Sequence, residues 1–143
     1  MDILLFRHYP LVEGPSMRSF ALQITTGLSA RGHRVREITA PVVFGRLTTR
    51  RSGISKWLGY IDQYILFPLQ LWWLSRSLPP RTLCVFSDQA LGPWLPALKH
   101  HPHVVHVHDL LNLQAAQGRQ PFHHLSLSGW LYQLWICSGF RQA

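Results

Sequence analysis

The chain has 143 residues, a length that suits one domain and is too short for two full α/β domains. Apolar residues make up 47% of it, with six Trp and seven Phe, and this excludes a disordered chain. Fourteen Lys and Arg against six Asp and Glu give a net charge of +8, as expected of a protein that meets phosphates, nucleic acid or an anionic membrane. No zinc finger, RNP-type aromatic motif or basic helix accompanies this charge, so nucleic acid is not an expected partner.

The two cysteines, Cys84 and Cys137, form neither a disulfide framework nor a CxxC metal motif. The first residues lack the basic start, the long apolar stretch and the cleavage site of a secretory signal peptide. Both observations predict a protein of the reducing cytoplasm.

The first part of the chain predicts a strand, a helix and a second strand. Residues 3–6 are a short apolar run, typical of a buried parallel strand. Residues 17–28 carry apolar side chains at helical spacing, with Ser16 as the expected N-cap and Gly32 as the stop signal. Residues 33–39 predict a weaker strand, because three charged side chains dilute its apolar pattern.

The middle of the chain continues this alternation. Residues 57–74 predict a long helix that is interrupted or kinked at Pro68. Two apolar runs, 83–86 and 104–107, predict buried strands that each end in polar residues, and Gln89–Leu98 between them predicts a short helix broken by prolines.

The last segment, residues 126–141, is helical in pattern and no strand follows it. A crossover helix normally leads to another strand, so we expect residues 1–143 to form one domain that is incomplete at its C-terminal end. The order of the elements predicts an α/β fold, in which a parallel sheet is covered by helices on both faces.

Ligands of open parallel sheets bind outside the carboxyl ends of the strands, so polar residues that follow the predicted strands are candidate site residues. They are Gly14, Ser16, Arg18, Ser87, Asp88, His108 and Asp109. We expect the first five to bind substrate and the last two to be catalytic.

The loop before the first helix has a specific use. Gly14 lets the backbone approach a ligand closely, and the helix N-terminus at Ser16 presents N–H groups to an anion such as a phosphate. The alternative is a capped helix after a tight turn. The loop is not GxGxxG, so a dinucleotide-binding fingerprint is absent.

His108 ends an apolar strand beside Asp109 and can exchange a proton near neutral pH. The alternative is a histidine packed under a loop and hydrogen-bonded to backbone. A metal-dependent hydrolase is a further alternative, because His106 and His108 lie on one side of the strand. No acidic cluster follows to complete a coordination shell, so no metal is expected.

The other histidine pairs, His100-His101 and His123-His124, are predicted to be loop and surface residues. The 18 residues 57–74 are near the minimum for a membrane span, but Asp62, Gln63 and Pro68 lie within them. We therefore expect a helix packed on the sheet, with Trp and Arg residues at a membrane surface.

Three segments together resemble the N-terminal domain of family-4 retaining glycosyltransferases, which have the GT-B fold. They are the first strand with its glycine-containing loop, the segment Leu28-Ser29-Ala30-Arg31-Gly32-His33-Arg34-Val35, and the segment Val104-Val105-His106-Val107-His108-Asp109. The resemblance runs from residue 1 to about residue 141 and implies a Rossmann-like domain.

The resemblance also implies a function. In that family the loop after the first strand has two glycines facing the donor phosphate or the acceptor, and here Gly14 is followed by Pro15, which has no N–H to offer. The family's strand-end histidine near the transferred sugar corresponds to His108. The donor nucleotide sugar binds mainly to a second domain with a Glu-x7-Glu pattern, which is missing from this sequence.

The expected function is therefore the acceptor-side half of a nucleotide-sugar-dependent glycosyltransferase. It needs no cofactor beyond the donor, and it is inactive without the C-terminal domain. A non-catalytic remnant of the fold is an alternative.

Overall fold

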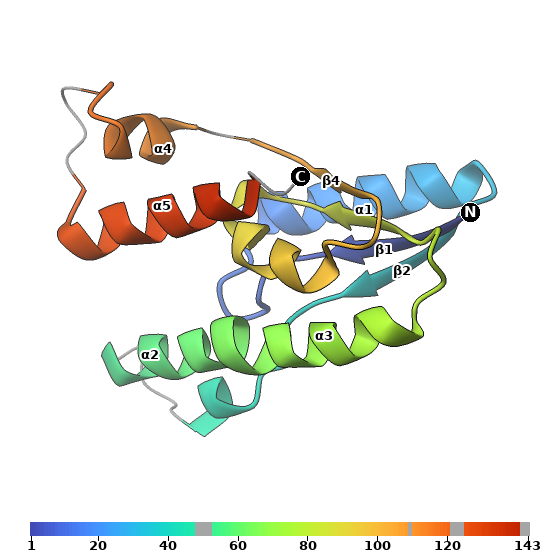
Figure 1. The fold of residues 1–143 in the computed structure, drawn as a ribbon, viewed down its shortest axis with the longest axis horizontal. Coiled ribbons are helices and arrows are strands. Elements are labelled where there is room, and N and C mark those ends of the chain that lie inside the picture. Colours follow the sequence, from blue (N-terminus) through green and yellow to red (C-terminus); the bar gives the residue numbers. More distant parts are fainter. Residues whose placement is uncertain (48–52, 109, 121–124, 141–143) are drawn as a thin grey trace.

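The computed structural model of the protein describes residues 1–47, 53–108, 110–120 and 125–140. Four strands form one all-parallel sheet in the order β2-β1-β3-β4 (Figure 1). They are β1 (Asp2–Phe6), β2 (Arg34–Ile38), β3 (Leu83–Phe86) and β4 (His103–Val105). This sheet confirms the predicted Rossmann-like α/β fold.

Helices cover both faces of the sheet (Figure 1). The β1 side chains alternate between the faces, and Ile3 and Leu5 pack with Ala21 of helix α1 (Pro15–Ala30). On the other face a long helix packs beside the 3-10 helix η3 (Gln89–Leu98).

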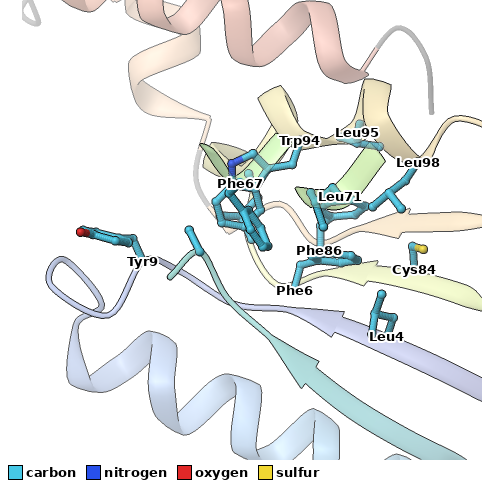
Figure 2. Packing of buried hydrophobic residues seen from close by; sticks show 12 residues of the cluster. Leu4, Phe6, Tyr9, Phe67, Leu71, Cys84, Phe86, Trp94, Leu95 and Leu98 are labelled. Carbon is cyan, nitrogen blue, oxygen red and sulfur yellow. The ribbon is translucent and has the colours of Figure 1, made fainter. Parts of the chain in front are cut away.

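The larger core lies on this second face, between the sheet, the long helix and η3 (Figure 2). Its central rings are Phe6 and Phe86, whose centroids lie 4.6 Å apart in a stacked arrangement. The buried members of this core are Leu4, Phe6, Tyr9, Ala40, Phe67, Leu71, Cys84, Phe86, Leu91, Trp94, Leu95 and Leu98.

The start of helix α1 differs from the sequence prediction. Gly14 is the N-cap and Pro15 is the first helical residue, so the prediction of Ser16 as N-cap is wrong. Proline is well suited to the first position, because its φ is already helical and its missing N–H has no partner there. The predicted stop is confirmed: Gly32 follows the helix with a φ of 80°, a conformation that favours glycine.

The long helix runs through α2 (Gly53–Ile61), a π-helical turn η2 (Asp62–Leu66) and α3 (Phe67–Ser77). The predicted interruption is this π turn, which ends at Leu66, two residues before Pro68. The Phe67 N–H donates to the Asp62 carbonyl, five residues back. The carbonyl of Gln63 would then pair with residue 68, and proline has no N–H. The indole Nε1 of Trp94 donates to that carbonyl at 2.8 Å.

Strand β4 (His103–Val105) begins one residue before the predicted strand over 104–107 and ends two residues before the predicted end. Its partner β3 ends at Phe86, and the last ladder bond joins the His106 N–H to the Phe86 carbonyl at 2.9 Å. Helix α4 (Leu111–Ala116) is absent from the sequence prediction, whereas α5 (Leu127–Phe140) confirms the predicted last helix.

Helix α5 packs closely against η3 through two glycines. A Cβ added to Gly92 would lie 2.6 Å from the Ile136 carbonyl oxygen, and one added to Gly139 would clash with the Gly92 backbone. We expect Gly139→Ala to lower the free energy of unfolding by about 1–3 kcal/mol, because neither backbone can give way.

The matched control is Gly27→Ala in helix α1, where the nearest atom belongs to the flexible Arg31 side chain at 3.4 Å. This change should raise stability by about 0.5–1 kcal/mol. Urea unfolding followed by circular dichroism measures both. Equal effects of the two substitutions would contradict the close approach of α5 and η3.

Candidate functional site

The sheet order places a topological switch point between β1 and β3. The chain leaves β1 toward β2 on one side and returns to β3 on the other, so the loops after β1 and β3 diverge. His8 and Asp88 each lie two residues beyond the end of these strands. The His8 Nε2 is 3.5 Å from the Asp88 Oδ2, and the two side chains are 17% and 10% exposed.

Asp88 is also the N-cap of η3. Its Oδ1 accepts a hydrogen bond of 2.6 Å from the Ala90 N–H. Burial opposes ionisation of this carboxyl, but the His8 imidazole and the Ala90 amide outweigh burial and hold the pKa of Asp88 below its usual value. Asp88 is therefore a carboxylate at neutral pH.

His108 is fixed by the segment that follows β3. Its Nε2 lies 2.9 Å from the Ser87 carbonyl oxygen, and its own N–H donates to the Gln89 Oε1 at 3.0 Å. A carbonyl only accepts, so Nε2 carries a proton, and in the neutral ring Nδ1 is left with a lone pair. His108 can therefore receive a proton from a bound ligand through Nδ1.

A cluster of rings joins His108 to helix α1. The Phe20 ring lies 4.5 Å from the His108 ring and 4.4 Å from the His106 ring, and the two imidazoles lie 4.2 Å apart. Partial burial and then the nearby His108 lower the pKa of His106, so its ring is neutral at neutral pH. Ser16 lies one helical turn before Phe20, on the same side of α1.

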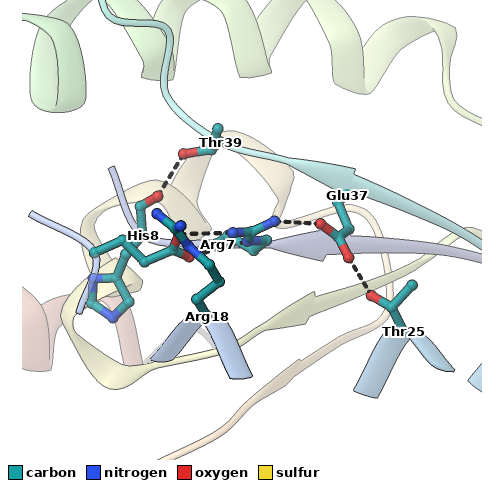
Figure 3. A network of polar contacts seen from close by, with 7 residues as sticks. Arg7, His8, Arg18, Thr25, Glu37 and Thr39 are labelled. Carbon is teal, nitrogen blue, oxygen red and sulfur yellow. Dashed lines mark hydrogen bonds and ion pairs between the residues drawn. The ribbon is translucent and has the colours of Figure 1, made fainter. Parts of the chain in front are cut away.

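The loop between β1 and α1 is held by a network of ion pairs (Figure 3). Arg7 contacts Glu13 at 2.7 Å and Glu37 at 2.5 Å, and Glu37 accepts a 2.6 Å hydrogen bond from Thr25. The Arg18 Nε lies 3.4 Å from Glu13, and its side chain is 65% exposed. Arg18 is thus held near Glu13 and still open to solvent.

The structure places the expected substrate residues in two groups. Ser87 and Asp88 lie beside His108, with the backbone carbonyl of Ser87 as the contacting group. Gly14 and Ser16 are at the start of α1, where the first helical bond joins the Arg18 N–H to the Gly14 carbonyl. The N–H groups of the residues before Arg18 have no acceptor within the helix. Asp109 lies outside the described residues.

Two further histidine predictions can be compared with the structure. His101 lies in a loop as predicted, but the prediction that it is a surface residue is wrong, because it is 7% exposed and its Nε2 contacts the Ser75 carbonyl at 3.0 Å. His123 and His124 lie outside the described residues. Within the described part of the chain, no group of three His, Cys, Asp or Glu is placed to hold a metal ion.

Sequence reasoning missed His8 and Phe20 as site residues. His8 follows the first strand as directly as Asp88 follows the third, and this position was the available signal. The helical spacing assigns Phe20 to the apolar stripe of its helix, and only the packing of α1 against the segment after β4 brings it to the imidazoles.

Two cavities share Tyr132 of helix α5 as a lining residue. One of about 160 Å³ lies between η3, α4 and α5, and Gln89 lines it. The other, of about 560 Å³, lies between the long helix and α5. Its aromatic lining residues are Trp57, Tyr60, Tyr64, Tyr132 and Trp135. The hydroxyls of Tyr64 and Tyr132 share a 2.7 Å hydrogen bond at its wall.

No protein-family model matches the chain, and neither a curated protein nor a solved structure matches it. In the part of the chain that is described, no helix combines the length and the apolar character that a membrane crossing requires.

Proposed function

We propose that this chain is the acceptor-side domain of a nucleotide-sugar-dependent retaining glycosyltransferase. The observation that supports it best is the meeting of His8, Asp88 and His108 outside the carboxyl ends of the strands. This edge of an open parallel sheet is where ligands bind in Rossmann-like folds.

The chemistry of the site suits a phosphorylated ligand. Glycosyl transfer builds negative charge on the leaving diphosphate, and N–H donors, cations and helix N-termini stabilise it. Here the start of α1 supplies backbone N–H groups, and Arg18 supplies a solvent-exposed cation. His108 presents Nδ1 as a proton acceptor for an acceptor hydroxyl.

The cavity between the long helix and α5 is the candidate acceptor pocket. Its volume of about 560 Å³ lies within the range of ligand pockets, and its wall combines aromatic rings with hydroxyl groups. Rings stack on the apolar face of a sugar while hydroxyls bond its edges. The donor's nucleotide, by the resemblance, belongs to a second domain.

The proposal places the protein in the cytoplasm. No disulfide joins Cys84 and Cys137, and Cys84 is buried in the core. Burial raises the pKa of the Cys84 thiol to about 11, which keeps it protonated and unreactive at neutral pH.

Calorimetric titration with UDP-glucose and GDP-mannose tests the proposal. Because the donor-binding pattern is missing from the sequence, we expect dissociation constants in the millimolar range, about −4 kcal/mol, and no sugar transfer by the isolated chain. His108→Ala should weaken binding about fivefold, the effect of losing one hydrogen bond from a sugar hydroxyl to the His108 Nδ1.

The matched control is His100→Ala, an exposed histidine at the amino end of β4. It should bind like the unchanged protein. Absence of binding at any concentration, or equal effects of the two substitutions, would favour a non-catalytic domain. Micromolar binding would mean that the donor site lies on this chain.

A further inference from the structure

One face of the long helix exposes large apolar side chains to solvent. Trp57 and Trp73 are each 68% exposed, and between them lie Ile65 and Leu69 at 58% and 57%. Trp72 is 46% exposed. We call these five residues the tryptophan stripe. An apolar surface of this kind is unusual in a protein that meets only water.

The π turn keeps the tryptophan stripe on one side of the helix. In a regular α-helix each step of four residues drifts by about 40° around the axis, so residues 57, 65 and 73 would spread over the surface. A π turn holds more residues than an α turn and reverses part of this drift. The buried residues Gln63, Phe67 and Leu71 accordingly lie together on the opposite side, in the core.

The exposed charges of this helix are cationic. Arg76 lies over the Trp72 ring, with its guanidinium carbon 3.3 Å from the ring centroid, and it also approaches Trp73 at 5.4 Å. Lys56 is exposed at the other end of the stripe. The acidic residue of the helix, Asp62, is fully buried and bonded to Tyr9 and three backbone amides.

The other described carboxylates are also engaged. Asp2 pairs with Arg34, Glu13 and Glu37 contact Arg7, and Asp88 bonds the Ala90 amide. The net charge of +8 is therefore carried by a surface with little exposed negative charge. A second copy of the chain would meet this surface with the same charge.

We propose that the tryptophan stripe binds an anionic phospholipid surface, with the helix axis in the plane of the membrane interface. Trp side chains favour this interface, since their rings are apolar and their N–H groups bond to water and headgroups. Arg76 and Lys56 face the lipid phosphates, and the helix does not cross the bilayer. Trp57 also lines the cavity between the long helix and α5. Leu69, Trp73 and Arg76 belong neither to that cavity nor to the His8 and His108 site, so substitutions at these three positions separate lipid binding from sugar binding.

Vesicle co-sedimentation tests the apolar contribution. The full chain should bind vesicles of equal phosphatidylcholine and phosphatidylglycerol, and raised salt should weaken the binding. The double variant Leu69→Ser, Trp73→Ser should bind about tenfold more weakly, since it removes exposed apolar area from the stripe. The control Leu22→Ser alters a leucine that is 61% exposed on α1, and it should bind like the unchanged protein.

A charge variant tests the lipid preference and does not touch the core. Arg76→Gln should lower the affinity for the mixed vesicles about fivefold, while Arg36→Gln on exposed strand β2 should have a smaller effect. Binding to pure phosphatidylcholine should be weak for all variants.

Three outcomes would overturn the proposal: no binding to the mixed vesicles, equal loss in Leu22→Ser, or equal binding with and without phosphatidylglycerol. Analytical sedimentation of the protein without vesicles can give a fourth outcome that would overturn the proposal. A dimer that the double variant abolishes, without any vesicle binding, would show that a second copy covers the stripe.

Discussion

Replacing Asp62 by Ala is expected to lower the free energy of unfolding by about 4 kcal/mol, the largest loss we expect for a single polar side chain. Its carboxylate accepts a hydrogen bond of 2.6 Å from the Tyr9 hydroxyl. It also accepts hydrogen bonds of about 3 Å from the backbone amides of Val43, Phe44 and Gly45. Asp62 is fully buried, so removing the carboxylate leaves these four donors without a partner and out of reach of water. Urea unfolding measures the loss.

The ionisation of Asp62 should also make the free energy of unfolding depend on pH. Burial opposes its ionisation, but the Tyr9 and backbone hydrogen bonds outweigh it and hold the pKa below the usual value. The stability that Asp62 contributes is therefore complete above about pH 4 and is lost as the pH falls through the lower folded value. Asp62→Asn should show a smaller loss of stability in acid than the unchanged protein.

Asp2→Ala is the matched control, because Asp2 pairs with Arg34, which is 84% exposed. This change should alter stability by about 0.5 kcal/mol at most. If Asp62→Ala cost no more than Asp2→Ala, the Asp62 carboxylate would not hold the segment from Val43 to Gly45 against the long helix.

Trp94→Ala is expected to cost about 3–5 kcal/mol, the effect of a large cavity in a packed core. Trp94 is 1% exposed, and its ring meets Phe67 edge-on at 4.7 Å (Figure 2). Trp94→Phe keeps a ring but removes the donor to the Gln63 carbonyl, so it should cost about 1–3 kcal/mol.

Thermal and urea unfolding of the two Trp94 variants separate packing from hydrogen bonding. Equal losses would mean that the indole N–H contributes the whole effect, and a neutral Trp94→Phe would mean that the π turn needs no side-chain donor. The double variant Trp94→Phe, Pro68→Ala tests the hydrogen bond separately. The Pro68→Ala change restores a backbone N–H that can donate to the Gln63 carbonyl, so it should recover part of the stability lost in Trp94→Phe.

The strands and the main helices could be predicted from the sequence because their signals are local. The apolar runs at Leu83–Phe86 and in β1 are short and continuous, which is typical of strands buried in a parallel sheet. The π turn could not be predicted, since it depends on Trp94, which lies 31 residues from Gln63. Pro68 showed where the helix is irregular, and the tertiary contact decides how.

The site was predictable in part for the same reason. The positions of Asp88 and His108 after strands predict the edge of the sheet, but the approach of His8 to Asp88 depends on strand order. The N-cap prediction failed because Ser16 has a strong capping preference, whereas Pro15 is the first helical residue and the N-cap is Gly14, two residues earlier than Ser16. Phe20 shows that an apolar helix position can also line a site.

The central claim is that a phosphorylated sugar ligand binds at the carboxyl edge between β1 and β3. Nuclear magnetic resonance of the histidine ring nitrogens during a titration with UDP-glucose tests it most directly, because His8, His106 and His108 surround this edge while His33 and His100 lie at the other end of the strands. We expect the first three rings to shift with one saturation curve and the last two to stay unchanged. Saturable binding that shifts His33 or His100 and leaves His8 and His108 unchanged would contradict the account.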